Sequence, residues 1–284
     1  MTNPSPPNLV AKRFDFDGTF SGYFEGGKPG ALPLLVMHGI GPGASVSSAF
    51  ASIFGFLCDH FHVFAMDFLG FGSSGKKAAP PYFDFATWVR QAEALVSLMP
   101  QGDFGIFGHS LSGAVALRLA SRNKRVKSVI TTGTAGAAFK VPRDLEQLWT
   151  FPHSRDDLFR TFRSLVFDAD KIPDAELDRR WAILGAPGYG DYYDKMFEGG
   201  LEQKQKLIDQ AILLDSELAA IRIPVTLVHG RDDYACRWED TSLPLAQKIA
   251  NSDLVILSRC GHAPSMEHPG KVIACVKSAF SIAQ

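Results

Sequence analysis

Residues 104–113 read FGIFGHSLSG, and this stretch decides the architecture that we expect for the chain. The apolar run 104–107 has the length of a buried strand, and it leads directly into a glycine–serine turn. From 111 to 122 apolar residues recur at helical spacing, so a helix is expected to begin at this turn. A strand that enters a helix through so tight a turn projects the side chain of its central residue, Ser110, into the cleft above the sheet.

The turn around Ser110 has the composition that an exposed nucleophile needs. Small residues are required two positions before and after such a serine, because the backbone there is strained. Gly108 supplies the first, and Ser112 stands where the usual G-x-S-x-G pattern has its second glycine. The start of the helix favours an anion that develops there, through the helix dipole. The alternatives are a tight turn without chemistry, or Ser112 as nucleophile, which fits less well inside the helix with Ser110 and Ala114 as its flanks.

Short apolar runs alternate with segments of helical periodicity along most of the chain. Strands are expected at residues 32–37, 62–66, 104–107, 126–131, 225–229 and 254–258, and helices near 85–99, 111–122, 241–251 and 269–281. This alternation predicts an α/β fold with a mainly parallel sheet and helices on both faces. The alternating pattern before residue 27 predicts an antiparallel hairpin at one edge of the sheet.

Residues 136–218 interrupt this rhythm with helical patterns, many aromatic and charged residues, and no convincing strand. We interpret them as a helical lid inserted between two late strands, which leaves 1–135 and 219–284 as the α/β core. Such an insertion lies above the strand ends, where open α/β sheets place their sites. So short a segment cannot bury all of its aromatic side chains internally. The remainder should line a pocket between the lid and the core.

The composition excludes several classes of protein. With 46% hydrophobic and 21% charged residues, the 284-residue chain is neither disordered, nor collagen-like, nor a coiled coil. A formal net charge of -1 without a basic run argues against nucleic acid and anionic membrane surfaces as partners. The 4 Cys contain no C-x-x-C pair, which favours reduced thiols over a disulfide framework or a zinc site. Without a signal-peptide pattern or the roughly 18 unbroken apolar residues of a membrane span, a cytoplasmic protein is expected.

Two later segments supply the partners that a nucleophilic Ser110 requires. A serine hydroxyl is a weak nucleophile and needs a base, which is oriented in turn by a carboxylate. The sequence GRDD follows one late strand, and CGH follows the next. We expect His262 to be the base and Asp233 the acid, because the usual spacing is Gly, two residues, then Asp. Asp232 is the runner-up for the acid.

The glycine-rich stretch HGIGPG at 38–43 follows an early strand and supplies the remaining part of a hydrolytic site. The backbone N–H of Ile40, together with that of Leu111, would form an oxyanion hole, with each donor commonly worth about 3 kcal/mol. The substrate-binding residues expected beside these groups are Gly39, Gly41 and His109. A phosphate-binding loop is the competing interpretation, but the stretch lacks both the Gly-Lys-Ser/Thr of a P-loop and the dinucleotide pattern. No cofactor and no metal are therefore expected.

Taken together, these segments resemble the α/β-hydrolase superfamily over essentially the whole chain. Within that superfamily the chain is similar to the meta-cleavage product hydrolases, which hydrolyse carbon–carbon bonds during the degradation of aromatic compounds. The matching segments are HGIGPG at 38–43, GRDD at 230–233, CGH at 260–262 with Glu267-His268 after it, and DRRW at 178–181.

The resemblance implies a substrate, a vinylogous 1,5-diketone of the 2-hydroxy-6-oxo-hexa-2,4-dienoate type, cleaved to a 2-hydroxydienoate and a carboxylic acid. In the family the enol first ketonises, and the carbanionic fragment leaves as the Ser-His-Asp machinery hydrolyses the bond. The resemblance also places Arg180 and Trp181 over the active site, with Arg180 on the carboxylate or dienolate of the substrate. A surface ion pair with a neighbour such as Asp178 is the alternative for Arg180. Because homodimers are common in such families, a homodimer is also expected.

Two departures from the family pattern keep other functions open. Ser112 replaces a glycine, and only Ser45, Ser47 and Ser48 stand where the family tends to have an asparagine that helps to hold the dienoate. The substrate could instead be an ester, an amide or a bicyclic diketone, which would make the protein a carboxylesterase or an amidase. A cofactor-free oxygenase and a non-catalytic ligand receptor are further alternatives. A dehalogenase or an epoxide hydrolase would need Asp in place of Ser110.

Overall fold

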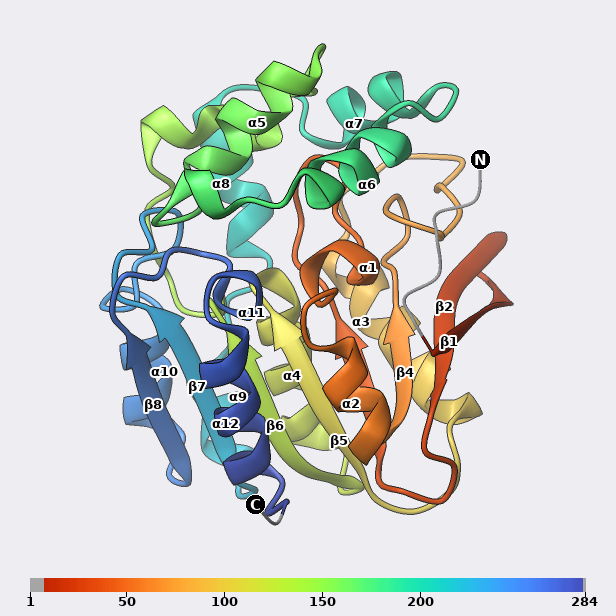
Figure 1. Cartoon of the computed structure of the whole chain (residues 1–284), viewed down its shortest axis with the longest axis vertical. Coiled ribbons are helices and arrows are strands. Elements are labelled where there is room, and N and C mark those ends of the chain that lie inside the picture. Colours follow the sequence, from red (N-terminus) through yellow and green to blue (C-terminus); the bar gives the residue numbers. More distant parts are fainter. Residues whose placement is uncertain (1–7, 283–284) are drawn as a thin grey trace.

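The computed structural model describes residues 8–282, apart from the side chains of residues 144 and 145, and shows one eight-stranded sheet (Figure 1). The strands are β1 (Leu9–Phe16), β2 (Thr19–Gly27), β3 (Pro33–Met37), β4 (His62–Met66), β5 (Phe104–His109), β6 (Val126–Thr132), β7 (Val225–Gly230) and β8 (Ser252–Leu257). Their order across the sheet is β1-β2-β4-β3-β5-β6-β7-β8. Strands β3 to β8 pair in parallel, whereas β2 is antiparallel to both β1 and β4. The expected edge hairpin and the mainly parallel sheet are thus confirmed.

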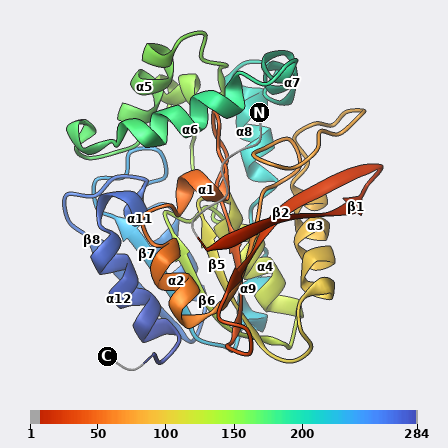
Figure 2. The ribbon, with the colours of Figure 1, turned by 45° about the vertical axis from the view of Figure 1, so that its right-hand side comes forward.

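Helices cover both faces of this sheet (Figures 1 and 2). One face carries α2 (Phe54–His60) and α12 (Pro269–Ala279), and the other carries α3 (Phe85–Leu98), α4 (Leu111–Arg122), α9 (Asp215–Ala220) and α10 (Ser242–Lys248). Strand β3 is buried along its whole length, as expected where both faces are covered. Its side chains alternate between two core clusters, with Leu34 and Val36 in one and Leu35 and Met37 in the other. Within residues 8–282, no helix is both long and apolar enough to cross a membrane.

The chain between β6 and β7 contains no strand in the structure, and most of it lies above the carboxyl ends of the parallel strands (Figure 1). Its elements are η1 (Arg143–Trp149), α5 (Arg155–Arg163), η2 (Ala169–Lys171), α6 (Asp174–Leu184), α7 (Tyr189–Met196) and α8 (Leu201–Asp209). Helix α9, which follows them, packs against α4 of the core. The proposed boundary between residues 218 and 219 therefore falls inside α9. We propose that the lid consists of the elements from η1 to α8.

Three short helices were not expected from the sequence pattern: α1 (Val46–Ala49), α2 and α11 (Pro264–Glu267). Helices of four to seven residues carry too few turns to display a period, and tertiary contacts stabilise them. Helix α1 begins with a capping box, in which the hydroxyls of Ser45 and Ser48 each bond to the backbone N–H of the other residue. These two serines thus have a local structural role.

Candidate active site

Ser110 occupies the sharp turn between β5 and α4. Its φ of 56° is positive, which is uncommon for a residue other than glycine and reflects local strain. The surroundings allow this turn only with small residues. A Cβ added at Gly108 would lie 2.6 Å from the carbonyl oxygen of Ser112, and one at Gly39 would lie 2.7 Å from the Cβ of Ser110. The expected strand–turn–helix geometry at Ser110 is therefore present, with the loop after β3 in close contact.

Ser110, His262 and Asp233 form one chain of hydrogen bonds across the ends of β5, β7 and β8. The Oγ of Ser110 lies 2.9 Å from Nε2 of His262, and Nδ1 of His262 lies 2.7 Å from Oδ2 of Asp233. The other oxygen of Asp233 accepts from the backbone N–H groups of Ala235 and Cys236, both at 3.0 Å. This is the arrangement in which a serine donates to an imidazole that a carboxylate orients.

Asp232, the alternative acid, faces away from this chain. Its Oδ2 accepts from the backbone N–H of Arg259 at 2.9 Å, and its own N–H donates to the carbonyl of Cys260. It thus joins the loop after β7 to the loop after β8. Gly230 permits this close approach, since a Cβ there would lie 2.0 Å from the carbonyl oxygen of Gly261. Of the two aspartates, Asp233 is the one in contact with His262.

The charges of the buried groups follow from their neighbours. Burial alone would lower the pKa of His262, but the adjacent Asp233 carboxylate outweighs it and raises this pKa above its usual value. Burial also opposes ionisation of Asp233, yet His262 and the hydrogen bond from His229 hold the pKa of Asp233 well below its usual range. For His109, whose ring centroid lies 5.2 Å from that of His262, burial and the proximity of His262 lower the pKa to about 3. His109 is therefore a neutral group beside the site.

Ser112, the departure from the glycine pattern, is fully buried and hydrogen-bonded. Its Oγ accepts from the N–H of His109 at 2.8 Å and lies 2.7 Å from the carbonyl oxygen of Met37, to which it donates. The hydroxyl thus ties the turn to β3, and it does not face the base. Position 113, by contrast, has no room for a side chain, because a Cβ at Gly113 would lie 1.7 Å from Oγ1 of Thr134. A serine at 112 therefore has a structural role that is compatible with the turn.

The loop after β3 presents an unpaired backbone donor to the site. Within residues 8–282, the N–H groups of Ile40 and Leu111 donate no hydrogen bond, and both residues line the same cavity as Ser110. The N–H of Leu111 belongs to the first turn of α4, where N–H groups have no partner within the helix and can bind an acceptor from outside it. His38 supports this loop: its Nδ1–H donates to the carbonyl of Gly39, while its Nε2 accepts from the N–H of Phe68.

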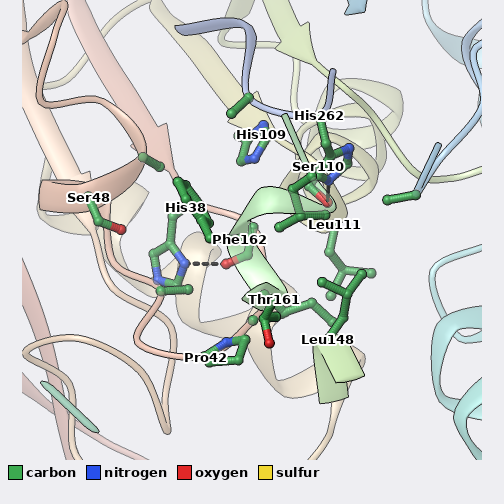
Figure 3. A pocket seen from close by; sticks show the side chains of 18 of the residues that line it. His38, Pro42, Ser48, His109, Ser110, Leu111, Leu148, Thr161, Phe162 and His262 are labelled. Carbon is green, nitrogen blue, oxygen red and sulfur yellow. Dashed lines mark hydrogen bonds between the residues drawn. The ribbon is translucent and has the colours of Figure 1, made fainter. Parts of the chain in front are cut away.

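One cavity lies between the core and the lid and contains Ser110 (Figure 3). Its polar lining includes His38, Ser45, Ser48, His109, His262 and Ser265, and its apolar lining includes Phe139, Leu148, Trp149, Leu158, Phe162, Leu165, Ile208 and Met266. The expected residues Gly39, Ile40, Gly41, Leu111 and Arg180 also line it. Trp181, the remaining expected substrate residue, does not; it is half-buried and packs against the core cluster. The predicted pocket between the lid and the core is therefore present.

Arg180 extends from α6 to the loop after β3. Its Nε donates to Glu176 at 2.7 Å, its Nη1 donates to the carbonyl of Pro42 at 3.1 Å, and its guanidinium lies 4.4 Å from the centroid of the Phe162 ring. The ion pair of Arg180 is thus with the buried Glu176, not with Asp178 at the surface. The sequence contained a signal for this pair, because Glu176 precedes Arg180 by one helical turn.

Two further residues at the site were not anticipated. His229, on β7, lies 3.0 Å from Asp233, and Glu267, on α11, accepts from the N–H groups of Gly261 and Ala263 beside His262. Glu267 was noted only as part of a matching segment, and His229 appeared as the end of a strand. Among the described residues, no group of three or more His, Cys, Asp or Glu side chains is arranged to hold a metal ion.

Comparisons with known proteins agree with this architecture. Residues 33–269 match the family model of the alpha/beta hydrolase fold. The chain is 28% identical over 246 residues to a 2-hydroxymuconate semialdehyde hydrolase of Pseudomonas sp. (strain CF600), covering 86% of this chain and 85% of that protein. It is 27% identical over 273 residues to a 2-hydroxy-6-oxo-6-(2'-aminophenyl)hexa-2,4-dienoic acid hydrolase of Metapseudomonas resinovorans, covering 95% and 90% of the two chains.

Among solved structures, the fold is similar to that of a 2-hydroxy-6-oxo-6-phenylhexa-2,4-dienoate hydrolase from Rhodococcus sp. strain RHA1. The TM-score is 0.84 at 26% identity, with 96% of this chain and 99% of that chain covered. Since the family model spans most of the chain and the sheet has the corresponding topology, the protein is a member of the alpha/beta hydrolase family.

Proposed function

We propose that the protein is a serine-type hydrolase in which Ser110 attacks a carbonyl carbon of the substrate. The observation that carries this proposal is the hydrogen-bonded chain from Ser110 through His262 to Asp233, of which Ser110 and His262 line the cavity. His262 takes the proton of Ser110 as the bond forms, and the ionised Asp233 stabilises the resulting imidazolium. The N–H groups of Ile40 and Leu111 receive the oxyanion, each contributing about 3 kcal/mol to transition-state stabilisation.

We propose further that the substrate is of the 2-hydroxy-6-oxo-hexa-2,4-dienoate type and that a carbon–carbon bond is cleaved. The names of the relatives support this substrate class, and so does a cationic group in a largely apolar cavity. A guanidinium has five N–H donors, and within residues 8–282 only Nε and Nη1 of Arg180 have acceptors. Arg180 therefore retains donors for a substrate carboxylate, while Phe162 and the other apolar residues enclose the group on the 6-oxo carbon.

In this reaction the attacked carbonyl carbon is the 6-oxo carbon. After ketonisation, its bond to the adjacent chain carbon breaks, and the electron pair of that bond is delocalised toward the carboxylate end near Arg180. The electron pair is delocalised onto the oxygen on C2, and the proton that His262 took from Ser110 goes to this enolate oxygen, which gives the 2-hydroxydienoate. Water, deprotonated by His262, then releases the acyl group from Ser110 as a carboxylic acid.

A carboxylesterase is the second candidate, and one observation favours it. The positive charge of Arg180 is already countered by Glu176, whose side chain is 3% exposed, and one of its donors is occupied by the carbonyl of Pro42. A site of this kind also suits a neutral acyl group. The same Ser110, His262 and oxyanion donors would serve ester hydrolysis without change.

The test of the proposal is a spectrophotometric assay with a coloured aryl-substituted 2-hydroxy-6-oxohexa-2,4-dienoate, run beside a panel of p-nitrophenyl esters. Bleaching of the dienoate that is abolished in Ser110→Ala is the expected result. Cleavage of the esters without bleaching would favour the esterase. If the folded protein acts on neither substrate but binds one equivalent of the dienoate intact, the hydrolase proposal is contradicted in favour of a receptor.

A further inference from the structure

Asp233 is in contact with a second histidine, His229, which comes from the strand that precedes it. His229 lies on β7, four residues before Asp233, and is 0% exposed. Its Nε2 is 3.0 Å from Oδ2 of Asp233, the same oxygen that lies 2.7 Å from Nδ1 of His262. One carboxylate oxygen is therefore shared by two imidazole rings.

The surroundings of His229 determine where its proton lies. Besides Asp233, Nε2 faces the carbonyl oxygen of Cys236 at 2.6 Å, and both partners can only accept. Nε2 must therefore carry a hydrogen, because a bare nitrogen there would place lone pairs against two acceptors. On the other side of the ring, Nδ1 lies 2.7 Å from Oγ of the buried Ser242, whose hydroxyl can donate to it. With hydrogen on Nε2, the ring shares this donor between Asp233 and Cys236 and accepts from Ser242 at Nδ1.

We infer that His229 is a positioning residue that acts through Asp233 and limits the basicity of His262. The inference rests on the proposed roles of Ser110, His262 and Asp233. The hydrogen bond from His229 to Oδ2 withdraws part of the carboxylate charge that would otherwise act on His262, and it fixes the carboxylate in the plane that His262 requires.

The other titratable or charged groups near this chain lie outside β7, and in the part of the chain that the structure describes none of their side chains bonds to His229; Cys236 contacts it through its backbone carbonyl. They are His109 on β5, Arg180 on α6, Cys236 after β7, and Cys260 and Glu267 around the loop of His262. Removal of the donor at position 229 should therefore raise the pKa of His262 by about half a unit, without changing these groups.

The experiment follows inactivation by a fluorophosphonate from pH 5 to 9, with mass spectrometry of the adduct on Ser110. This readout does not depend on which substrate the enzyme uses. His229→Met removes the hydrogen-bond donor but keeps a side chain of similar volume. In this variant, the acidic limb of the curve of inactivation rate against pH should move to higher pH by about half a unit. The inactivation rate should then fall about threefold more at pH 6 than at pH 8. His229→Gln, whose amide reaches the position of Nε2 as a donor, should restore the limb of the wild type.

Ser242→Ala is the matched control, because it disturbs the same buried cluster but leaves the hydrogen on Nε2 of His229. It should lower thermal stability without moving the acidic limb. The inference is overturned if His229→Met leaves the limb in place, or if Ser242→Ala moves it equally. Wild-type protein that forms no adduct on Ser110 would contradict the proposed function itself.

A measurement on the wild type covers the case in which His229→Met does not fold. In ¹⁵N-histidine-labelled wild-type protein, the ring resonances of His229 are identified as those that are absent from His229→Gln. Their chemical shifts should show a hydrogen on Nε2. A ring protonated on Nδ1 alone would overturn the inference.

Discussion

Ser110 and Ser112 show how two serines of one turn divide between chemistry and structure. Ser110 has a positive φ and a hydroxyl that faces His262, whereas the hydroxyl of Ser112 is enclosed between the backbone of His109 and Met37. The position of each side chain follows from the turn: the central residue projects outward and the residue two positions later enters the helix. Substitution of Ser110 should therefore affect the reaction, and substitution of Ser112 should affect the stability of the fold.

We predict that Ser110→Ala abolishes labelling by a fluorophosphonate while the fold remains intact. Ser112→Ala should retain labelling but lose about 1–3 kcal/mol of stability, because it leaves buried backbone groups of the turn unpaired. Labelling followed by mass spectrometry, together with thermal unfolding, tests both statements. Persistent labelling in Ser110→Ala, lost in Ser112→Ala, would assign the nucleophile to Ser112.

The raised pKa of His262 predicts the acidic limb of the pH profile. His262 can accept a proton from Ser110 only when it is neutral, so kcat/KM should rise with pH through a pKa above the usual value of about 6.5. Asp233→Asn removes the charge that raises this pKa, and turnover should fall by about 10⁴. Asp232→Asn should leave both the limb and turnover nearly unchanged. The reverse ranking of the two variants would show that Asp232 is the acid.

The loop that carries His262 is joined to the lid segment after α5. The carboxylate of Glu267 accepts from the N–H of Gly261 at 2.9 Å and from that of Phe167 at 2.8 Å. The N–H of His262 donates to the carbonyl of Leu165 at 2.6 Å. One side chain of α11 thus connects the base to the wall of the cavity.

We predict that Glu267→Ala increases amide hydrogen exchange in residues 165–168 and 260–263 together, and lowers kcat. The physical reason is that three backbone donors lose their shared acceptor, which frees both segments at once. Glu146→Ala, which removes a contact with Lys204 within the lid, is the control. Faster exchange in one of the two segments alone would mean that Glu267 does not couple them.

The lid and the core meet at Arg180, so its role is tested by comparing substrates. Arg180→Gln should reduce kcat/KM for dienoates about 10- to 100-fold, as expected for the loss of a charged hydrogen bond, and should affect aryl esters little. Arg179→Gln is the matched control, because Arg179 bonds to the same Glu176 but does not line the cavity. Equal, small losses for both substrates would assign Arg180 a structural role.

Over the whole chain, hydrophobic periodicity predicted the strands and the longer helices of the core, and it missed the shortest helices. The strand at 62–66 and the helix at 111–122 were predicted closely, because a short apolar run sets the first and apolar residues at helical spacing set the second. Residues 54–60 form a helix that carries too short a pattern to be predicted. This helix ends at His60, and β4 begins at His62.

The residues of the candidate site that lie in turns after strands could be predicted from the sequence. Those whose position depends on packing between elements were harder to predict. Ser110, Asp233 and His262 follow strand ends, and parallel strands bring those ends to one edge of the sheet. Trp181 was expected in the pocket beside Arg180, but adjacent residues of a helix point in directions about 100° apart, and Trp181 lies outside the lining. The contact between His229 and Asp233 depends on the loop conformation after β7, which no pattern encodes. The expected homodimer stays a prediction.

Covalent catalysis by Ser110 can be observed by rapid-quench mass spectrometry of the wild-type protein during a single turnover of an aryl dienoate. We expect a transient mass increase equal to the aryl acyl group, located on the peptide that contains Ser110, which decays as the carboxylic acid forms. Bleaching of the dienoate at full rate with that peptide unmodified at every time point would show that Ser110 is not the nucleophile.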